Sequence, residues 1–353
     1  MKDQKKLFNN LISVIIPVFN VESYLEEALN SVINQTYVNL EIIVINDCSS
    51  DRCGEICERY AKIDDRIIVL HNESNKGLAT TRNIGLSIVR GSYVFFLDSD
   101  DWIELNAIEV LVESAVKNNA DIVVARKYDE YVGKTIIPTK LKKKDMVPFL
   151  YTNTDILLEY LDGKFEDAIW NKLYRTQLFD GIVFPDGRNY EDVSTTWKLM
   201  KRVVEKGGII VLLPDILFHF RMRNSSISHT KSLSNTVDAW TAYREKYEGL
   251  PSLSRLLLAD CYSQIGSMWM SYAGFSSDEK TKATKIMKEM LGFSRQNYPV
   301  VMKECVNGRS YSLKTKALCL ISQTTNSFVI KICYVVGIVI HRYRYSKNEK
   351  MFK

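Results

Sequence analysis

Three aspartates directly follow an apolar run in the segment "VFFLDSDDWIE", which spans residues 94–104. Asp98, Asp100 and Asp101 are separated only by Ser99, and carboxylates this close raise each other's pKa unless a positive charge lies among them. In an extended backbone, positions i and i+2 point to the same side, so Asp98 and Asp100 are expected to act together. Two hard oxygen ligands suit Mg²⁺ or Mn²⁺, which completes its coordination with phosphate oxygens and water. The cluster therefore predicts a metal site that receives a diphosphate. One of these carboxylates alone could instead cap the helix expected from Glu104, but three are more than a cap needs.

The elements that must position these carboxylates alternate between strand and helix over the first 125 residues. The expected strands are short apolar runs, and the expected helices carry apolar residues at i, i+4 spacing. Crossover helices between strands predict a mostly parallel sheet with helices on both faces, and such sheets bind ligands at the carboxyl ends of their strands. The expected strands are 13–16, 40–45, 66–70, 93–97 and 121–125, and the expected helices are 20–33, which Asn20 would cap, 51–62, 78–89 and 104–118.

With 353 residues, the chain is long enough for a full α/β core and a second domain. We expect residues 1–125 and 126–228 to form the two halves of one α/β domain, and residues 229–353 to form a helical region. An apolar content of 46% and a charged content of 25% are typical of a soluble globular protein. A net charge of +5 is too small to indicate a nucleic-acid partner.

The seven cysteines include no CxxC pair, which favours free thiols in a reducing compartment. The apolar N-terminal run is broken by Asn9, Asn10 and Pro17, and this favours a first strand over a signal peptide. Both observations predict a cytoplasmic protein.

The C-terminal sequence is apolar and then basic. Residues 328–340 form a run of 13 residues that contains Lys331, which is short of the roughly 20 that a spanning helix needs. Arg342, Arg344 and Lys347 follow, so we expect a helix in the plane of an anionic membrane surface from about residue 317. The alternative is a terminal helix packed on the protein's own core.

Several chemistries use an acidic site at this edge of a sheet. The first turn, "PVFNVES" at residues 17–23, lacks the glycines of a dinucleotide fold, which argues against hydride transfer and nucleotidyl transfer. A metal-dependent phosphatase or phosphotransferase also places Asp-x-Asp after an apolar strand, although normally after the first strand. Glycosyl transfer from a nucleotide sugar uses a metal to hold the departing diphosphate. A non-catalytic, membrane-bound scaffold is a further alternative, which the complete set of acidic residues disfavours.

The segments "SVIIPVFN", "EIIVINDCSSD", "NKGLATTRNIGL" and "VFFLDSDDW" stand in the order and spacing of family 2 glycosyltransferases, which the chain resembles over residues 12–104. A looser similarity continues through "WNKLYR", "YEDV" and "RMRNSSIS" to about residue 228. The resemblance implies the GT-A fold, a Rossmann-like and mostly parallel sheet flanked by helices. Residues 1–125 would bind the nucleotide sugar, and residues 126–228 would form the acceptor and catalytic half.

The resemblance also implies roles for the residues that match the family's motifs. Asp47 would accept the N3 proton of uracil, in a turn where Asn46 and Cys48 replace the usual Asp and Gly. Asp100 would be the main ligand of Mn²⁺ or Mg²⁺, with Asp98 nearer the ribose or the donor sugar. The residues implied to bind the donor are Pro17, Phe19, Asn20, Glu22, Asp47, Arg82, Asp98, Ser99, Arg221 and Arg223, and those implied to bind the metal are Asp100, Asp98 and His219.

Glu191 and Asp192 resemble the family's Glu-Asp pair, which implies that Asp192 is the general base and that Glu191 supports it or contacts the acceptor. Either could instead cap the following helix, and His219 could be a half-buried structural residue. A single displacement by the deprotonated acceptor predicts inversion at the anomeric carbon.

The implied function is transfer from a UDP-sugar to a lipid-linked saccharide in surface-polysaccharide assembly, such as capsule. The enzyme would be peripheral on the inner face of the cell membrane.

Overall fold

The computed structural model describes residues 10–137, 147–161, 163–223, 232–253 and 275–301, together with the single positions 257, 261, 264 and 268. The chain divides into two compact units, Met1–Arg223 and Asn224–Lys353. No helix among the described residues is long and apolar enough to cross a membrane. The segment expected at the membrane, from about residue 317, and the motif residues 224–228 lie outside the described residues.

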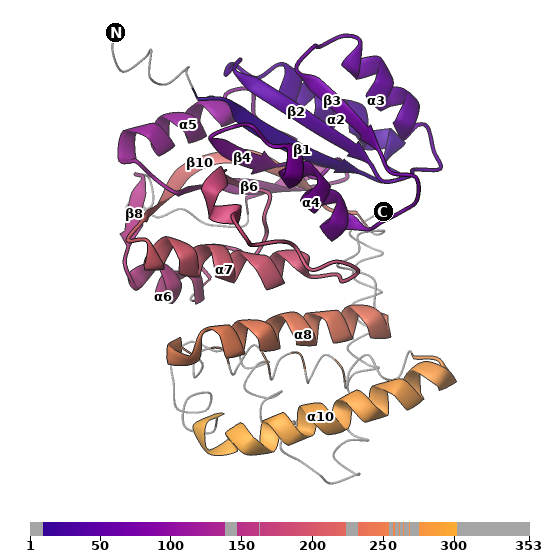
Figure 1. The fold of residues 1–353 in the computed structure, drawn as a ribbon, viewed down its shortest axis with the longest axis vertical. Helices are drawn as coiled ribbons and strands as arrows, with labels where there is room; N and C mark the ends of the chain where they lie inside the picture. The colour runs from indigo at the N-terminus through magenta and orange to yellow at the C-terminus, as the bar shows by residue number, and fades with distance from the viewer. Residues whose placement is uncertain are drawn as a thin grey trace. The chain divides into compact units, whose positions relative to one another are not determined.

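Within the described residues, the first unit contains one ten-stranded sheet in the order β3-β2-β1-β4-β9-β6-β10-β5, with β7 beside β6 and β8 beside β10. The strands from β3 to β4 pair in parallel, as the crossover helices predict. All residues of β1 and β2 are buried, because helices cover both faces. This part of the chain runs through β1 (Ile12–Val18), α2 (Glu22–Ile33), β2 (Leu40–Asn46), α3 (Cys53–Ala61), β3 (Ile67–His71), α4 (Leu78–Ile88), β4 (Tyr93–Phe96) and α5 (Ala107–Asn118) (Figure 1).

The two faces of the parallel strands pack against different helices. Val14 and Ile16 belong to a buried cluster with Leu25 of α2 and with apolar residues of α3 and α5. On the opposite face, Gly85 of α4 lies so close to Ile15 that a Cβ atom at Gly85 would come within 2.7 Å of the isoleucine side chain. Glycine therefore lets α4, which carries Arg82, pack directly on β1.

Beyond β4 the sheet is mixed. β9 (Lys172–Arg175) lies antiparallel between β4 and β6, although it follows both in the sequence. β5 (Trp102–Ile103) pairs with the end of β10, so the helix expected from Glu104 begins only at Ala107. The expected α/β architecture is confirmed. The remaining elements of this unit are β6 (Ile122–Tyr131), β7 (Lys134–Ile136), β8 (Phe149–Thr152), α6 (Asp155–Leu161), η2 (Thr176–Phe179), α7 (Glu191–Glu205) and β10 (Ile209–Arg221).

The expectation that Asn20 caps the first helix is wrong. Helix α2 begins at Glu22 after Val21, and no side chain caps it. Asn20 has a positive φ of 51°, and its Oδ1 accepts a 2.8 Å hydrogen bond from the backbone N–H of Ser50. A partner on the neighbouring loop therefore replaces the local cap.

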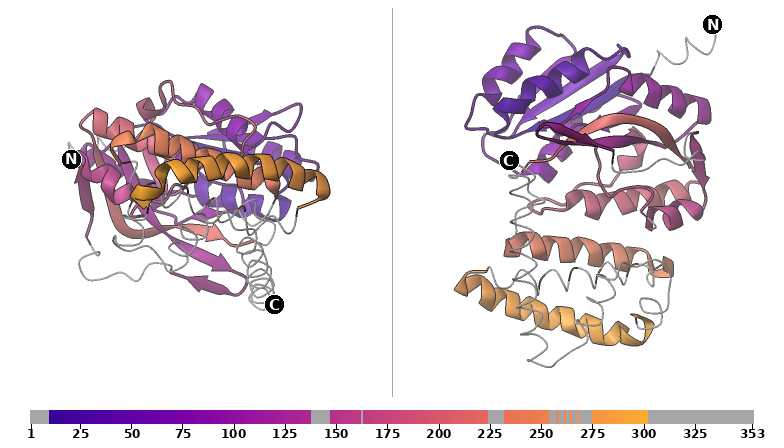
Figure 2. Two further views of the ribbon diagram at one scale, coloured as in Figure 1. Left: turned by 90° about the horizontal axis from the view of Figure 1, so that it is seen from below. Right: turned by 180° about the vertical axis from the view of Figure 1, so that it is seen from behind.

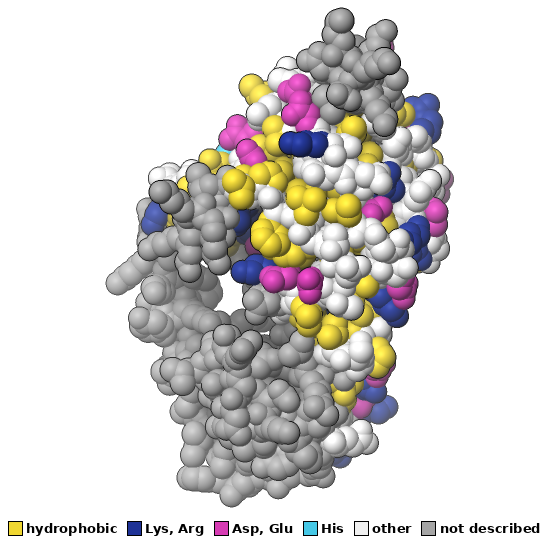
Figure 3. Space-filling model, turned by 90° about the vertical axis from the view of Figure 1, so that its left-hand side faces the viewer, with side chains coloured by type: hydrophobic (Ala, Val, Ile, Leu, Met, Phe, Trp, Pro, Cys, Tyr) yellow, Lys and Arg dark blue, Asp and Glu magenta, His cyan; other side chains and the backbone are white. Residues whose placement is uncertain are grey.

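Exposed apolar side chains gather beside β8 and α6, where Phe149, Leu150 and Leu158 are 53%, 47% and 42% exposed. Figure 3 shows hydrophobic side chains spread over this side of the molecule. Because β8 pairs with residues 209–212 at the start of β10, the patch lies away from the carboxyl ends of the strands. It is therefore separate from the expected site.

The described residues of the second unit are largely helical. α8 (Leu233–Gly249) begins after Ser232, whose Oγ accepts a 3.0 Å hydrogen bond from the N–H of Asn235. α10 (Ser277–Val301) runs beside it (Figure 2), with Trp240 and Phe293 packed edge to face at 5.3 Å. A short helix, η4 (Pro251–Leu253), follows α8.

Candidate active site

The three aspartates lie in a turn rather than on an extended strand. β4 ends at Phe96, and the N–H of Asp101 donates a 3.0 Å hydrogen bond to the carbonyl of Asp98. The expectation that an extended backbone aligns Asp98 and Asp100 is therefore wrong. Arginines hold the two carboxylates instead, since Arg82 donates to Asp98 at 2.6 Å and Arg223 pairs with Asp100. Ser99 between them is buried.

Asp101 and Arg221 hold the turn of residues 98–101 in place. Asp101 is 1% exposed, and its Oδ1 accepts a 2.7 Å bond from the N–H of Arg221. The Arg221 side chain donates to the carbonyl of Asp100 at 2.7 Å and lies over the rings of Tyr24 and Trp102 at 4.8 and 4.5 Å. Burial and the charges of Asp100 and Asp98 raise the pKa of Asp101 well above its ordinary value. In this arrangement Arg221 anchors the acidic turn. Its contact with a phosphate of the donor stays a prediction.

Arg82 joins the acidic turn to the start of α7. Its side chain is 2% exposed and pairs with Asp98 through one nitrogen and with Glu191 through the other. Burial acts to lower the pKa of Arg82, but the carboxylates of Asp98 and Glu191 raise it above its ordinary value. A permanently charged guanidinium therefore brings together two segments that lie far apart in the sequence.

Asp192 lies beside this ion pair but does not share it. α7 begins at Glu191, and among the described residues the Asp192 carboxylate accepts one hydrogen bond, of 2.7 Å, from the N–H of Val193. Burial, and then the charges of Glu191 and Asp167, raise the pKa of Asp192 to about 8. A partly buried carboxylate whose pKa is close to neutral is suited to accept a proton.

Asp47 is fully engaged with the loop that follows β3. One oxygen accepts hydrogen bonds from the side chain of Asn72 at 2.7 Å and from the N–H of Lys76 at 2.8 Å, and the other accepts from the N–H of Gly77 at 2.8 Å. Asp47 is 3% exposed and lies just past the end of β2. It therefore holds the loop that leads into α4 and Arg82.

The other residues predicted to bind the nucleotide lie at the end of β1. Pro17 is within the buried strand, and Phe19, which follows it, is 45% exposed. Glu22 accepts a 3.0 Å bond from the N–H of Arg52, and Asn20 binds Ser50 as described. β1 and β2 are neighbours in the sheet, so these residues and Asp47 lie together at one edge of it.

The model of the family described as Glycosyl transferase family 2 matches residues 13–187. The glycosyltransferase GlyG of Streptococcus pneumoniae is 33% identical over 240 residues, which cover 63% of this chain and 74% of that protein. The chain is a family 2 glycosyltransferase. GlyA of the same organism is 37% identical over 241 residues, which cover 66% of this chain but 34% of GlyA, so the chain spans about a third of that relative. A putative teichuronic acid biosynthesis glycosyltransferase of Bacillus subtilis, TuaG, is 32% identical over 235 residues, which are 67% of this chain and 88% of that protein.

Solved structures share the fold of this glycosyltransferase. Residues 1–349 of TarS from S. aureus, crystallised with UDP-GlcNAc, superpose with a TM-score of 0.59 at 19% identity, covering 95% of this chain and 92% of that one. A mannosyltransferase of Pyrobaculum calidifontis, in complex with GDP-Man and Mn²⁺, gives a TM-score of 0.53 at 14% identity, covering 93% and 86%. The expected GT-A fold is confirmed.

His219 of this glycosyltransferase is enclosed by other side chains. Its ring stacks between Trp102 and Tyr128 at 4.7 Å from each. Nδ1 lies 2.8 Å from Glu130, and Nε2 lies 3.1 Å from Glu104. The described residues bring together no group of three or more His, Cys, Asp or Glu side chains that could hold a metal. Metal binding by His219 stays a prediction, and in the structure its two ring nitrogens contact glutamates.

A hydrogen-bonded clasp that the sequence did not reveal connects α4 to the loop before α7. The Asn83 side chain donates to the carbonyl of Phe184 at 2.8 Å and accepts from its N–H at 2.9 Å. Thr80 donates to Asp186 at 2.9 Å. Asn83 adjoins Arg82 in "TTRN", so the clasp holds α7 where Glu191 meets Arg82. The position of Asn83 directly after Arg82 in the sequence is the local feature that points to this clasp.

Lys172 in "WNKLYR" is a second residue that the sequence left without a role. It is completely buried, and Nζ donates to the carbonyl of Ala168 at 2.6 Å and to Oδ1 of Asn171 at 2.8 Å. Burial lowers its pKa to about 8, while Glu166, Asp167 and Asp192 act in the opposite direction. Lys172 is therefore a buried basic group close enough to Asp167 and Asp192 for their charges to act on it.

Proposed function

We propose that this glycosyltransferase transfers a sugar from a UDP-sugar to a lipid-linked saccharide, with inversion at the anomeric carbon, during surface-polysaccharide assembly on the inner face of the membrane. The observation that carries the proposal is the Arg82 bridge, which places the Asp98 turn next to Glu191 and Asp192. The complex of TarS with UDP-GlcNAc supports a uridine donor. Relatives named for teichuronic and teichoic acid biosynthesis support a surface-polysaccharide pathway, and family membership favours this reaction over the phosphatase alternative.

Asp98 and Asp100 fit a divalent ion. Arg82 pairs with Oδ1 of Asp98 and Arg223 with Oδ2 of Asp100, so the metal would use the second oxygen of each carboxylate. Burial and the charge of Asp98 raise the pKa of Asp100, against the effect of Arg223, and Oδ2 of Asp101 is buried without a partner. The turn thus holds more buried negative charge than its arginines offset. Mg²⁺ or Mn²⁺ on Asp100 and Asp98 would stabilise the charge of the departing diphosphate.

The residues of the chain supply the remaining chemistry. Asp192 takes the proton of the acceptor hydroxyl as that oxygen forms its bond to the anomeric carbon. The bond from the same carbon to the UDP oxygen breaks on the opposite side, so the configuration inverts and no covalent intermediate forms. Arg82 holds Glu191 beside Asp192, and Asp47 positions the loop that receives the base.

A screen of UDP-sugars for UDP release tests this function, with Mn²⁺ and with a chelator. At least one donor should be consumed by the wild type only when metal is present. Asp100→Ala should lower UDP release by about 100-fold or more, since charge stabilisation of the leaving group contributes several kcal/mol. Asp215→Ala removes an exposed carboxylate on β10 and should leave the rate unchanged. Equal rates in the two variants, or full activity with chelator, would rule out the metal assignment.

Membrane association requires its own experiment. Truncation of the chain before residue 317 should release it from sedimented inner membranes, because the segment from there contains the apolar and basic run. A full chain that already remains in the supernatant would contradict the proposal.

A further inference from the structure

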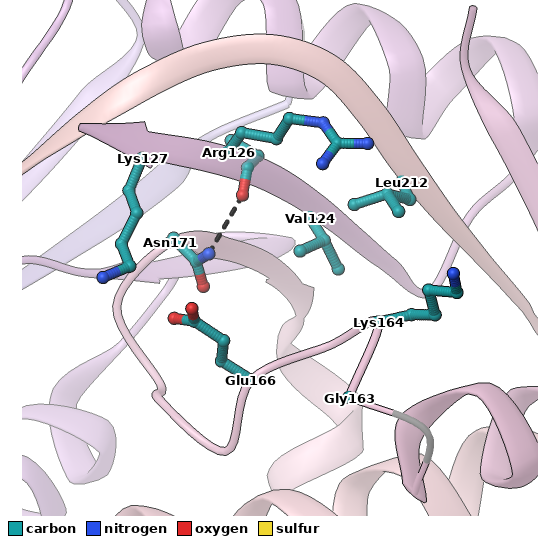
Figure 4. Close-up of a pocket in the computed structure, with 9 residues that line it drawn as sticks. Val124, Arg126, Lys127, Gly163, Lys164, Glu166, Asn171 and Leu212 are labelled. Carbon is teal, nitrogen blue, oxygen red and sulfur yellow. Dashed lines mark hydrogen bonds between the residues drawn. The ribbon is translucent and has the colours of Figure 1, made fainter. Parts of the chain in front are cut away.

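A small pocket lies between β6, β10 and the loop that precedes β9. Its volume is about 80 Å³, several times the roughly 10–15 Å³ that one water needs, and its size suits a single small polar group rather than a sugar ring. Figure 4 shows Arg126 and Lys164 on the Leu212 side of the pocket, with Glu166 and Lys127 across from them. Asn171 lies between these sides and donates to the carbonyl of Ala125 at 2.9 Å.

The pocket carries an excess of positive charge. Lys127 is paired with Asp129 at 2.6 Å, and Glu166 lies close enough to the buried Lys172 to act on its pKa. Arg126 and Lys164 have no ion-pair partner among the described residues, and Nε of Arg126 is buried without a hydrogen-bond partner. A buried N–H donor without a partner costs free energy, which an anion in the pocket would recover.

Strand register places the pocket next to the donor site. β9 pairs with β4 on one side and with β6 on the other, and Leu173 faces both Phe95 and Val123. Asp98 and Arg126 each stand three residues after these paired positions, so both lie toward the same end of the sheet. Both follow the buried parts of parallel strands, so the pocket lies toward the end of the sheet where Arg82 joins Asp98 to Glu191.

We propose that Arg126, Lys164 and Asn171 form a subsite for an anionic group, a phosphate or a carboxylate, of the saccharide acceptor. This inference rests on the proposed function, because it identifies the acceptor as an acidic one. The pocket binds the charged group of the acceptor, and the acceptor hydroxyl then reaches Asp192 from the side opposite the donor. The charge comes either from a diphosphate that joins the saccharide to its lipid or from an acidic sugar unit.

Binding of inorganic phosphate tests the subsite without any turnover. Melting of the full chain would be followed against phosphate concentration at constant ionic strength, with excess UDP to occupy the donor site. The wild type should be stabilised, and Arg126→Ala and Lys164→Ala should need roughly tenfold more phosphate for the same shift, since each loses a charge-assisted hydrogen bond. Lys117→Ala removes an exposed lysine at the end of α5, at the opposite edge of the sheet, and should behave as the wild type does.

Three outcomes of the phosphate titration overturn the proposal: no shift in the wild type, equal shifts in all variants, or equal loss in Lys117→Ala. Arg126→Lys keeps the charge and should keep most of the phosphate affinity, which separates lost binding from misfolding. Phosphate binding without UDP release from any donor would retain the subsite and reject the proposed function. UDP release without phosphate binding would do the reverse.

Acceptors that differ only in their charge identify its source. The same saccharide would be offered on a lipid diphosphate, on a neutral alkyl chain, and on the neutral chain with one uronic acid unit. Lys164→Ala should lower kcat/KM about tenfold for the diphosphate acceptor or for the uronic acid acceptor, and should leave the neutral acceptor unaffected. An equal loss for the neutral acceptor would show that the residue has no role in recognising charge.

Discussion

Asp47 and Asp51, on the side of the site proposed to bind the donor, and Asp192, which is proposed to act on the acceptor, are held in opposite ways. On the donor side, Asp47 accepts three hydrogen bonds, and Asp51 accepts bonds from Cys53 and Glu22 that keep its pKa low even though burial acts to raise it. On the acceptor side, burial and like charges raise the pKa of Asp192 to about 8. Carboxylates that accept several hydrogen bonds fix loops and add stability. A buried carboxylate without enough positive charge nearby keeps its capacity to take a proton, at a cost in stability.

The largest effect should come from removal of that capacity. Asp192→Asn should lower kcat by about 10²- to 10⁴-fold, the usual contribution of a general base, with little change in UDP affinity. Wild-type kcat should rise with pH up to about 8 and then level off, because only the ionised carboxylate accepts a proton. Initial-rate assays measure kcat, and titration with UDP measures the affinity for UDP. A variant that binds UDP tenfold more weakly but turns over normally would place Asp192 in the donor site.

Stability should separate the two sides. The folded-state pKa of Asp192, about 8, lies above its ordinary value of 3.8, so the folded protein retains the proton more strongly than the unfolded chain does. The free energy of unfolding therefore falls as pH rises from about 4 to about 8, and Asp192→Asn should remove part of that fall and melt at a higher temperature at pH 8.

Asp47→Asn is the matched substitution on the donor side. The amide would present N–H groups where the backbone of the loop now donates, so the free energy of unfolding should fall by about 1–3 kcal/mol. Chemical denaturation at pH 8 compares the two variants directly. Destabilisation by both substitutions would erase the contrast between the sides of the site.

A smaller effect should follow from loosening the clasp between them. Asn83→Ala removes both bonds to Phe184, and the loop before α7 would then hold Glu191 and Asp192 less firmly against Arg82. We expect kcat to fall about tenfold while UDP affinity stays within twofold, because misplacement of the base affects the reacting geometry alone. Asn34→Ala, which loses only a local bond to Asn30, is the control. A change in UDP affinity equal to the change in kcat would assign Asn83 to donor binding.

The two sides also differ in what their sequence reveals. β1 to β4 and their helices are predictable because apolar spacing is local, and the short acidic motifs fall at the strand ends. Asn20 was misassigned because Ser50, on another loop, competes for its side chain. The insertion of β9 between β4 and β6 follows from tertiary pairing that no local pattern encodes. The Arg126 pocket depends on that insertion, and so neither it nor the Asn83 clasp was predictable.

The smallest effect should come from the turn after β2, where Cys48 stands at the family's usual glycine position. Cys48 has a φ of 58°, in the left-handed region that costs an ordinary residue roughly 1–2 kcal/mol. Glycine relieves that strain but loses about 0.5–1 kcal/mol through the greater freedom of the unfolded chain.

Cys48→Gly should therefore raise the free energy of unfolding by about 0.5 kcal/mol. Cys48→Ala keeps the backbone strain while removing the thiol, and urea denaturation of the two variants isolates the backbone contribution. Both variants lose the 3.7 Å contact from Sγ of Cys48 to the carbonyl of Glu73, whereas the bonds of Asp47 to the same loop remain, so UDP affinity should be equal in both. A glycine variant that is less stable than the alanine variant would show that the left-handed backbone at Cys48 costs the folded protein no free energy.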